Sequence, residues 1–321
     1  MGCVYNIYPV ARPILIAAVR SNGITVLVAN VLKFSKRVAV IHALCEGTSI
    51  RATARLCKVD KDVVMRLGNT VGEGCAKLHD RMMRGVRPAY IEVDECWAFV
   101  FCKQKTKIRK KSKIVGHGDA YTMFAIDNET KLVPSYITAT RSMVTATKVM
   151  KDLRARTVGK YQMSVDGWPD WIEAVRRAFG HNGVHLGQTV KEYQRKKDTS
   201  TPERKYSPSR VKTITRTKVF GEPEEEMIST AKAEQKNLDT RMRTRRLTRL
   251  TNAFSKKARN LRAALHMHFF HYNFVREHGA HGTAPAVQAK LIKRPWTLEE
   301  MVTAALEAAG EKAETRPKMA A

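Results

Sequence analysis

The chain has 321 residues, and its 58 lysines and arginines outnumber its 30 acidic residues to give a formal net charge of +28. An excess of this size favours a polyanionic partner, with nucleic acid first. The six cysteines form no C-x-x-C pair, which argues against a disulfide framework or a zinc knuckle and fits a reducing cytoplasm. No apolar run reaches the ~18 residues that a membrane-spanning helix needs.

Residues 34–88 have the pattern of three short helices. Gly47 ends the first helix, Thr48 or Ser49 can cap the second, and Asp60 can cap the third, which begins at Lys61. A tight turn between the last two helices predicts a helix-turn-helix domain, whose third helix enters the major groove of DNA. The basic side chains expected to contact DNA are Arg51, Arg55, Lys58, Lys61 and Arg66. An ordinary helical bundle with a solvated basic face is the alternative.

Residues 1–33 are apolar without a clear period and stay unassigned. They fit either a short hairpin or an extension translated from an upstream start codon.

Residues 89–265 are predicted to fold as an α/β domain around a mixed sheet. The expected strands are 89–102, 121–126, 132–138, 161–165 and 185–193, and the expected helices are 142–156 and 171–179. The first three strands have short links and predict an antiparallel meander, in which Pro134 favours an edge position for the third strand. The polar, basic stretch at about 191–218 is predicted to be an inserted, mobile loop.

Two aspartates lie at positions where the carboxylate is expected to have a specific role. Asp94 lies within an apolar strand, where a buried carboxylate is costly unless it is paired or bound to a metal. Asp166 follows a strand and precedes Gly167, which puts its carboxylate at the mouth of the sheet, where open sheets bind ligands. Pairing of Asp94 or Glu95 with one of the many arginines is the alternative.

A third acid, Glu234, is expected near the start of a later helix that carries a basic stripe. Arg241, Arg245 and Arg249 recur at i, i+4 and i+8 and are expected to bind a phosphate backbone. The inward side of this helix is expected to consist of Leu238, Met242, Leu247, Leu250 and Phe254. Three carboxylates from separate elements suit two Mg²⁺ or Mn²⁺ ions, which prefer oxygen ligands and promote in-line phosphoryl transfer. A surface glutamate paired with arginine is an equally good interpretation of Glu234 from spacing alone.

Five segments resemble one known family in order along the chain. They are "VDECWAFV", "GDAYTMFAIDNETKLVPSYITATR", "SVDGWPDWIEAV", "AEQKNLDTRMRTRRLTRLTNAFSKK" and "HFFHYNFVREHGAHGTAPA". Together they cover most of residues 34–300 and resemble the transposases of bacterial insertion sequences of the insertion-sequence-one type, within the group with Asp-Asp-Glu sites.

The resemblance implies a ribonuclease H-like core and a Mg²⁺-dependent enzyme of the bacterial cytoplasm, associated with the nucleoid. Such an enzyme cuts double-stranded DNA at its element's terminal inverted repeats, joins the freed 3′-hydroxyl to target DNA, and works as a dimer or higher assembly. Carried over residue by residue, it makes Asp94, Asp166 and Glu234 the catalytic, metal-binding acids.

The chain departs from the family at Gln235, where relatives usually have arginine, and it lacks the N-terminal cysteine zinc motif that many relatives carry. A catalytically inactive DNA-binding remnant or repressor is therefore the alternative function. Residues 266–321 are expected to form a helical tail with Phe269, Phe270 and Phe274 in the core. The histidines there lack the ligand spacing of zinc sites and are expected on a partly buried helix.

Overall fold

The computed structural model describes residues 17–21, 24–28, 32–194, 201 and 210–311. Strands β1 (Ala17–Ser21) and β2 (Ile24–Val28) pair with each other in an antiparallel two-stranded sheet. Of the two interpretations of residues 1–33, the short hairpin is therefore the one present among the described residues.

Three helices follow with the bounds that the sequence predicts. They are α1 (Phe34–Cys45), α2 (Ile50–Leu56) and α3 (Lys61–Met82). The Ser49 hydroxyl accepts a hydrogen bond from the Ala52 amide at 3.2 Å, and the Asp60 carboxylate accepts one from the Asp62 amide at 2.7 Å. These contacts satisfy N–H groups that a helix start leaves without partners, so the two capping predictions are confirmed.

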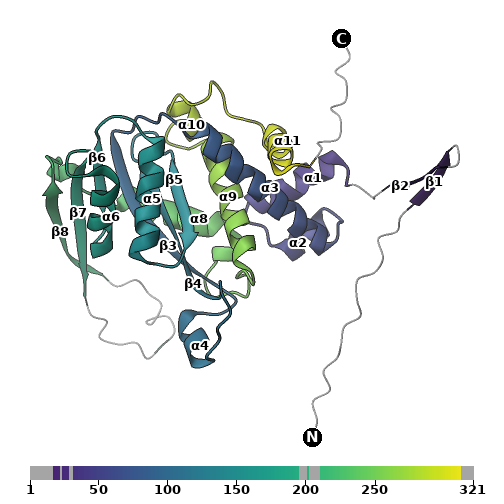
Figure 1. Ribbon diagram of the computed structural model, residues 1–321, viewed down its shortest axis with the longest axis horizontal. Helices are drawn as coiled ribbons and strands as arrows, with labels where there is room; N and C mark the ends of the chain where they lie inside the picture. The colour runs from purple at the N-terminus through teal and green to yellow at the C-terminus, as the bar shows by residue number, and fades with distance from the viewer. Residues whose placement is uncertain (1–16, 22–23, 29–31, 195–200, 202–209, 312–321) are drawn as a thin grey trace, which may run out of the picture.

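Helix α3 continues through three glycines because the later helices approach its backbone closely. The C-terminal region forms α9 (Ala258–Phe274), α10 (Pro285–Gln288) and α11 (Leu298–Ala309), and α3 packs beside α9 and α11 (Figure 1). A Cβ atom added at Gly72 would lie 2.2 Å from the Ala263 carbonyl oxygen, and one at Gly74 would lie 1.8 Å from the Ala305 carbonyl oxygen. The contacts leave no space for a side chain at either position.

Gly74→Ala is therefore expected to lower the free energy of unfolding by at least about 2 kcal/mol, because two helix backbones must separate to admit the methyl group. Gly68→Ala is the matched control in the same helix. Its added Cβ would lie 3.1 Å from a flexible Leu44 methyl group, and alanine favours the helix by about 1 kcal/mol. Urea unfolding of both variants checks this, and equal midpoints would contradict it.

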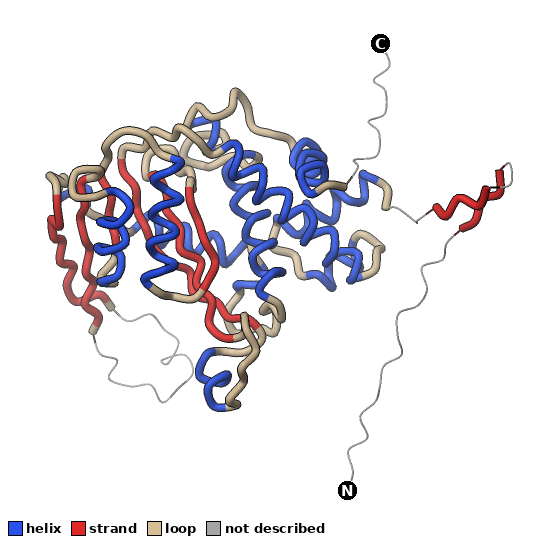
Figure 2. Tube along the Cα trace, in the orientation of Figure 1, coloured by secondary structure: helices blue, strands red, loops and turns tan. Residues whose placement is uncertain are grey.

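The centre of the fold is a mixed sheet of six strands, so the predicted α/β class is confirmed. The strands are β3 (Tyr90–Val100), β4 (Gly118–Asp127), β5 (Ser135–Ala139), β6 (Gln162–Val165), β7 (His185–Tyr193) and β8 (Val211–Phe220). They lie in the order β5-β4-β3-β6-β7-β8 (Figure 2). β3, β4 and β5 form the predicted antiparallel meander with β5 at the edge, and β6 and β7 continue the sheet parallel to β3. The strand β5 starts directly after Pro134, as an edge position favours.

Helices cover both faces of this sheet (Figure 1). On one face, α5 (Met143–Arg156) and α6 (Pro169–Phe179) pack against Ile91 and Val93 of β3. On the other face, α8 (Ala231–Arg243) and α9 pack against Cys96 and Ala98 of the same strand. Alternate residues of β3 therefore face different helical layers. Three short helices lie in the connections: α4 (Gln104–Arg109), η1 (Glu225–Met227) and η2 (Arg245–Leu247).

Helix α9 belongs to two hydrophobic cores at once. Its residues Leu265 and Phe269 pack against the sheet, whereas Phe270 and Phe274 pack in a helical core with α1, α3 and α11. The expected burial of all three C-terminal phenylalanines is confirmed. The expected boundary between residues 265 and 266 falls within α9, and residues of 34–88 and 266–321 share the helical core.

Two local predictions are wrong. The stretch 191–218 was expected to be a loop, but 191–193 end β7 and 211–218 belong to β8; residues 195–200 and 202–209 lie outside the described residues. The β-branched residues of β8 alternate with basic ones, and the charge obscures this strand pattern.

The basic stripe is also interrupted, because α8 ends at Arg243 and only Arg241 of the three arginines lies on it. Leu238, Met242 and Leu250, expected inside, are exposed. The buried side of α8 carries Lys236, Asn237 and Thr240 instead. The donor group of each side chain has a partner inside the protein, whereas the Asn237 oxygen has none among the described residues. Across the described residues no helix is long and apolar enough to cross a membrane.

Candidate metal site and basic surface

The centre of the candidate site is Asp94, in the middle of β3 on the face that α8 covers. Its two carboxylate oxygens accept different hydrogen bonds. One accepts the backbone N–H of Glu95 at 2.7 Å, and the other accepts the Asn237 amide of α8 at 2.6 Å. No ion pair joins Asp94 to an arginine or lysine among the described residues, but Arg141 pairs with Glu95 at 2.6 Å, so the arginine-pairing alternative holds for Glu95 and not for Asp94.

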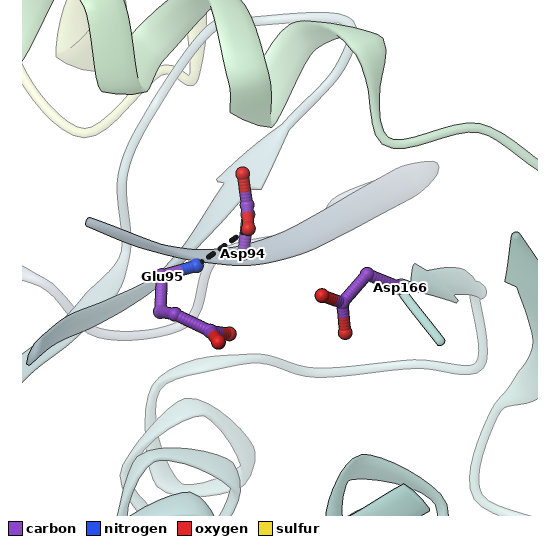
Figure 3. A group of neighbouring side chains, drawn as sticks. All are labelled: Asp94, Glu95 and Asp166. Carbon is purple, nitrogen blue, oxygen red and sulfur yellow. Dashed lines mark hydrogen bonds between the residues drawn. The ribbon is translucent and has the colours of Figure 1, made fainter. Parts of the chain in front are cut away.

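Glu95 and Asp166 complete a group of three carboxylates (Figure 3). One oxygen from each of Asp94, Glu95 and Asp166 lies within 4.8 Å of the others. Glu95 follows Asp94 in the strand and points to the opposite face, while Asp166 reaches both from the end of β6. Asp166 is oriented by the Trp168 amide, which donates to its carboxylate at 3.0 Å, and Gln188 of β7 donates to its backbone carbonyl at 3.0 Å.

The neighbouring positive charges do not neutralise all of the negative charge of these three carboxylates. Burial, together with the neighbouring charges of Glu95, Asp166 and Glu234, raises the pKa of Asp94 to about 7, although the hydrogen bond from the Glu95 amide acts in the opposite direction. Burial, followed by the charge of Asp166, also raises the pKa of Glu95. A carboxyl that stays protonated near neutral pH for these reasons gains from a bound cation.

The three acids fit a divalent cation with oxygen ligands. Opposite ligands of a bound Mg²⁺ are about 4 Å apart, so small side-chain rotations would bring these oxygens into its coordination sphere. One oxygen of Glu95 is buried and has no hydrogen-bond partner among the described residues, which leaves a lone pair free for such an ion. Mg²⁺ and Mn²⁺ both suit this donor set.

Glu234, the third predicted acid, lies near this group without joining it. It is in the first turn of α8, one turn before Asn237. One of its oxygens accepts from Thr230 at 3.0 Å and also pairs with Lys191 of β7. The Glu234 side chain is 48% exposed, so this ion pair is worth about 1 kcal/mol or less.

Another buried acid, Glu92, holds α8 in place. One of its oxygens accepts the backbone N–H groups of Lys232 at 2.7 Å and of Ala233 at 2.9 Å, at the start of the helix. A carboxylate there satisfies two helix N–H groups and interacts favourably with the helix dipole. Glu92 and Asp94 lie on the same face of β3, so two residues of one strand fix the position of α8 and of Glu234.

The basic residues predicted to contact DNA lie as follows. Arg51, Arg55, Lys58, Lys61 and Arg66 are all exposed, on α2, on the turn and at the start of α3. Arg245 and Arg249 are exposed in the segment after α8, while Arg241 is half-buried. The positive charges of Arg241 and Arg249 both act to lower the pKa of the Cys96 thiol, so both arginines lie near Cys96. Cys96 is two residues from Asp94 on the same face of β3, so these two arginines lie on the side of the sheet that carries Asp94.

Three residues of this site were not among the predicted ones. Glu95 was considered only as a possible partner of an arginine, and the end of β6 brings Asp166 within reach of both Asp94 and Glu95. Asn237 was noted only as sharing a helical face with Glu234, and a buried asparagine on a polar helix is the signal that could have identified it. Lys191 lies where the expected strand 185–193 and the expected loop at about 191–218 overlap, and no sequence pattern connected it with Glu234.

A search of known protein families finds none that matches the chain, and a search of curated proteins also returns no match.

Proposed function

We propose that the chain is a DNA transposase that uses divalent metal ions to cut DNA at its element's ends and to join the 3′-hydroxyl to target DNA. The observation that carries the proposal is the convergence of Asp94 and Asp166. Sequence motifs single out both residues, and they reach one site from two different strands. Structural ion pairs rarely need two uncompensated carboxylates at one place, whereas metal-dependent phosphoryl transfer does.

The sheet supports a ribonuclease H-like fold for the catalytic core. That fold has a three-stranded antiparallel meander continued by strands parallel to its first strand, and β5-β4-β3-β6-β7 has this order. Asp94 in the first strand and Asp166 after the fourth then take the positions that the family's two aspartates occupy.

Asp94 and Asp166 would hold the metal ions, which when bound activate a nucleophilic oxygen and stabilise the leaving oxygen. Asn237 donates to one oxygen of Asp94 and so fixes the direction in which the other lone pairs point. Glu92 holds the start of α8 against β3 and so sets the position of Glu234 relative to that strand. Arg241 and Arg249 would bind the phosphates that flank the scissile bond.

Glu234 would join the aspartates once it leaves Lys191. It lies on the same side of the sheet as Asp94, because α8 covers that face, whereas Glu95 points to the other side. Glu95 already has a cation, since Arg141 donates to it at 2.6 Å while lying over the Trp168 ring at 4.1 Å. We therefore assign the third catalytic carboxylate to Glu234 and a supporting role to Glu95.

Duplex binding is proposed for α2 and α3 in a helix-turn-helix arrangement. Lys61→Gln and Arg66→Gln, made together, are expected to weaken duplex binding and to lower the slope of log affinity against log salt by about 2, one unit per lost phosphate contact. Lys148→Gln with Lys151→Gln is the control, because these two exposed side chains of α5 give the same charge change on another part of the surface. Equal slopes for the two pairs would remove the assignment of α3.

The central test is cleavage of a labelled duplex that carries the DNA flanking this chain's own coding sequence. Cleavage near the element's ends is expected with Mg²⁺ or Mn²⁺ and is expected to be absent in EDTA. Cleavage that persists in EDTA would exclude the metal mechanism.

An inactive DNA-binding remnant is the second candidate, because Glu234 is paired with Lys191 and is followed by Gln235 in place of arginine. Tight, salt-sensitive binding to the same duplex without cleavage in either metal would favour it.

A further inference from the structure

A pocket of about 820 Å³ lies away from the carboxylates, between helices α2 and α3 and the segment 243–256 that follows α8. Its inner wall comes from α9, including Ala264 and Met267. Pockets that hold small ligands have volumes of about 300–1,000 Å³, so this one is large enough for a molecule with a ring system. Its place in the fold is the angle between α2, α3 and α9 (Figure 1).

The pocket is strongly basic. The basic residues that line it are Arg51, Lys61, Arg243, Arg245, Arg246 and Lys256. Asp62 is the one acid in the lining. Arg243 is paired with Glu46 at 2.9 Å and with Asp239 at 3.1 Å, but within the described part of the chain the other five have no carboxylate partner.

Arg246 is the clearest example of a basic residue in this pocket without a carboxylate partner among the described residues. Its hydrogen-bond partner is the Ser255 hydroxyl, at 3.1 Å, and burial lowers the pKa of its guanidinium. A guanidinium removed from water without an anion is unfavourable, and a bound anion would compensate it. Arg246 thus provides, inside the pocket, a site that a phosphate group fits.

The rest of the lining is partly polar and partly apolar. Ile50, Val64 and Met65 come from α2 and α3, and Phe254 and Met267 face them from the other side. A pocket for inorganic phosphate needs no such walls, and a pocket for a fatty acid needs no more than one or two cations. Asn252 adds an exposed amide, which can donate to and accept from the edge of a base.

We propose that this pocket binds a nucleotide, with the base against the apolar wall around Phe254 and the phosphate against Arg245, Arg246 and Lys256. The nucleotide could be a free nucleoside monophosphate or one unpaired unit of a DNA strand, since both present the same base and phosphate. The proposal does not depend on metal catalysis by the carboxylates, and its test is performed in EDTA.

The position of the pocket favours a unit of a DNA strand. Arg243 lines the pocket six residues after Asn237, which binds Asp94, and six residues of helix span about 9 Å. The opposite wall is formed by α2 and α3, which present the exposed basic residues Arg51 and Lys61. A strand held by both regions would pass the mouth of the pocket.

The test measures binding by calorimetry for three probes in EDTA: the four deoxynucleoside monophosphates, a single-stranded oligonucleotide, and inorganic phosphate. Ala253→Trp fills the pocket without changing its charge. Arg245→Gln with Lys256→Gln removes two charges from exposed side chains that make no hydrogen bond or ion pair among the described residues. Lys148→Gln with Lys151→Gln on α5 is the control for charge alone.

Both pocket variants are expected to weaken binding of the nucleotide or the oligonucleotide about tenfold or more, and the control pair is expected to leave it unchanged. Binding of the monophosphates identifies the free nucleotide as the ligand, and binding of the oligonucleotide alone identifies a DNA unit. The proposal is overturned if Ala253→Trp binds every probe as the unaltered chain does, or if inorganic phosphate binds as tightly as the nucleotides.

Discussion

Asp94→Asn is expected to reduce metal-dependent DNA cleavage on the order of 10³-fold or more while making the metal-free protein more stable. The loss of activity follows because a metal ion supplies several kcal/mol of stabilisation to the developing charge, and each 1.36 kcal/mol is a factor of ten in rate. Asparagine cannot supply the charge that holds the ion. Cleavage that survives in this variant would exclude Asp94 from catalysis.

The gain in stability follows from the direction of the pKa shift. Burial, and then the nearby charges of Glu95, Asp166 and Glu234, raises the pKa of Asp94 to about 7, above the value of about 3.9 in an unfolded chain. The folded protein therefore binds a proton more tightly than the unfolded chain, and stability decreases as the pH rises between these two values. Above pH 7 the full cost of the charge is present, and Asp94→Asn removes it.

The local hydrogen bonds allow this substitution. An asparagine oxygen can still accept from the Glu95 amide. Its NH₂ group can donate to the buried Asn237 oxygen once the Asn237 amide is turned, which gives up the 3.3 Å hydrogen bond from Asn237 to the Glu95 carbonyl. Unfolding midpoints in EDTA at pH 6 and pH 8 measure the effect, with Glu307→Gln on α11 as a control. A variant that is less stable than the original protein at pH 8 would contradict the proposed charge imbalance.

The same shift predicts how metal binding depends on pH. A proton must leave Asp94 before a cation can bind, so the apparent affinity for Mn²⁺ is expected to fall about tenfold for each pH unit below about 7. An affinity that is constant between pH 5.5 and 7 would show that Asp94 is already charged there.

The parts of the fold that the sequence predicted are those with local signals. Ser49 and Asp60 are capping residues, and their helices begin where expected. Pro134 correctly marked the edge strand. The missed strand β8 is exposed along nearly its whole length, and its register comes from pairing with β7 rather than from a buried face, so it has no apolar alternation to recognise.

Helix α8 was misread for a tertiary reason. A polar residue such as Lys236 is normally assigned to the solvent side, but here it is buried, with its ammonium group 2.7 Å from Asp239 and 3.1 Å from the centre of the Tyr272 ring. Asp239 lies on α8 itself, but Tyr272 comes from α9, far along the chain, so no local pattern indicates the burial. The same reversal of faces puts Asn237 against Asp94 and Leu238 in solvent.

The glycines of α3 show the same limit. Gly72 and Gly74 weaken a helix by propensity alone, so propensity does not explain their place within α3. Their use is visible only when the backbones of α9 and α11 are present, because those helices take up the space that a Cβ atom would need.

The choice between Glu234 and Glu95 as third carboxylate gives the second large prediction. Glu234→Gln is expected to lower cleavage about 100-fold or more, and Glu95→Gln less than about tenfold, because Arg141 already compensates the charge of Glu95. Glu226→Gln, in the exposed turn before α8, controls for loss of a carboxylate. If Glu95→Gln has the larger effect, the metal lies among Asp94, Glu95 and Asp166, and Glu234 is only the partner of Lys191.

Lys191→Gln removes the ion pair that holds the Glu234 side chain but leaves the Glu234 carboxylate unchanged. The exposed ion pair holds Glu234 with at most about 1 kcal/mol, so releasing it is expected to tighten Mn²⁺ binding by up to about fivefold. The gain should disappear when Glu234→Gln is added to Lys191→Gln, because without the Glu234 carboxylate there is no ion pair for the Lys191 substitution to release. Calorimetry with Mn²⁺ in the absence of DNA measures all three variants without requiring catalysis. A gain that persists in the double variant would mean that Lys191 acts on Asp94 and Asp166 through its charge, so Glu234 would have no part in holding the ion.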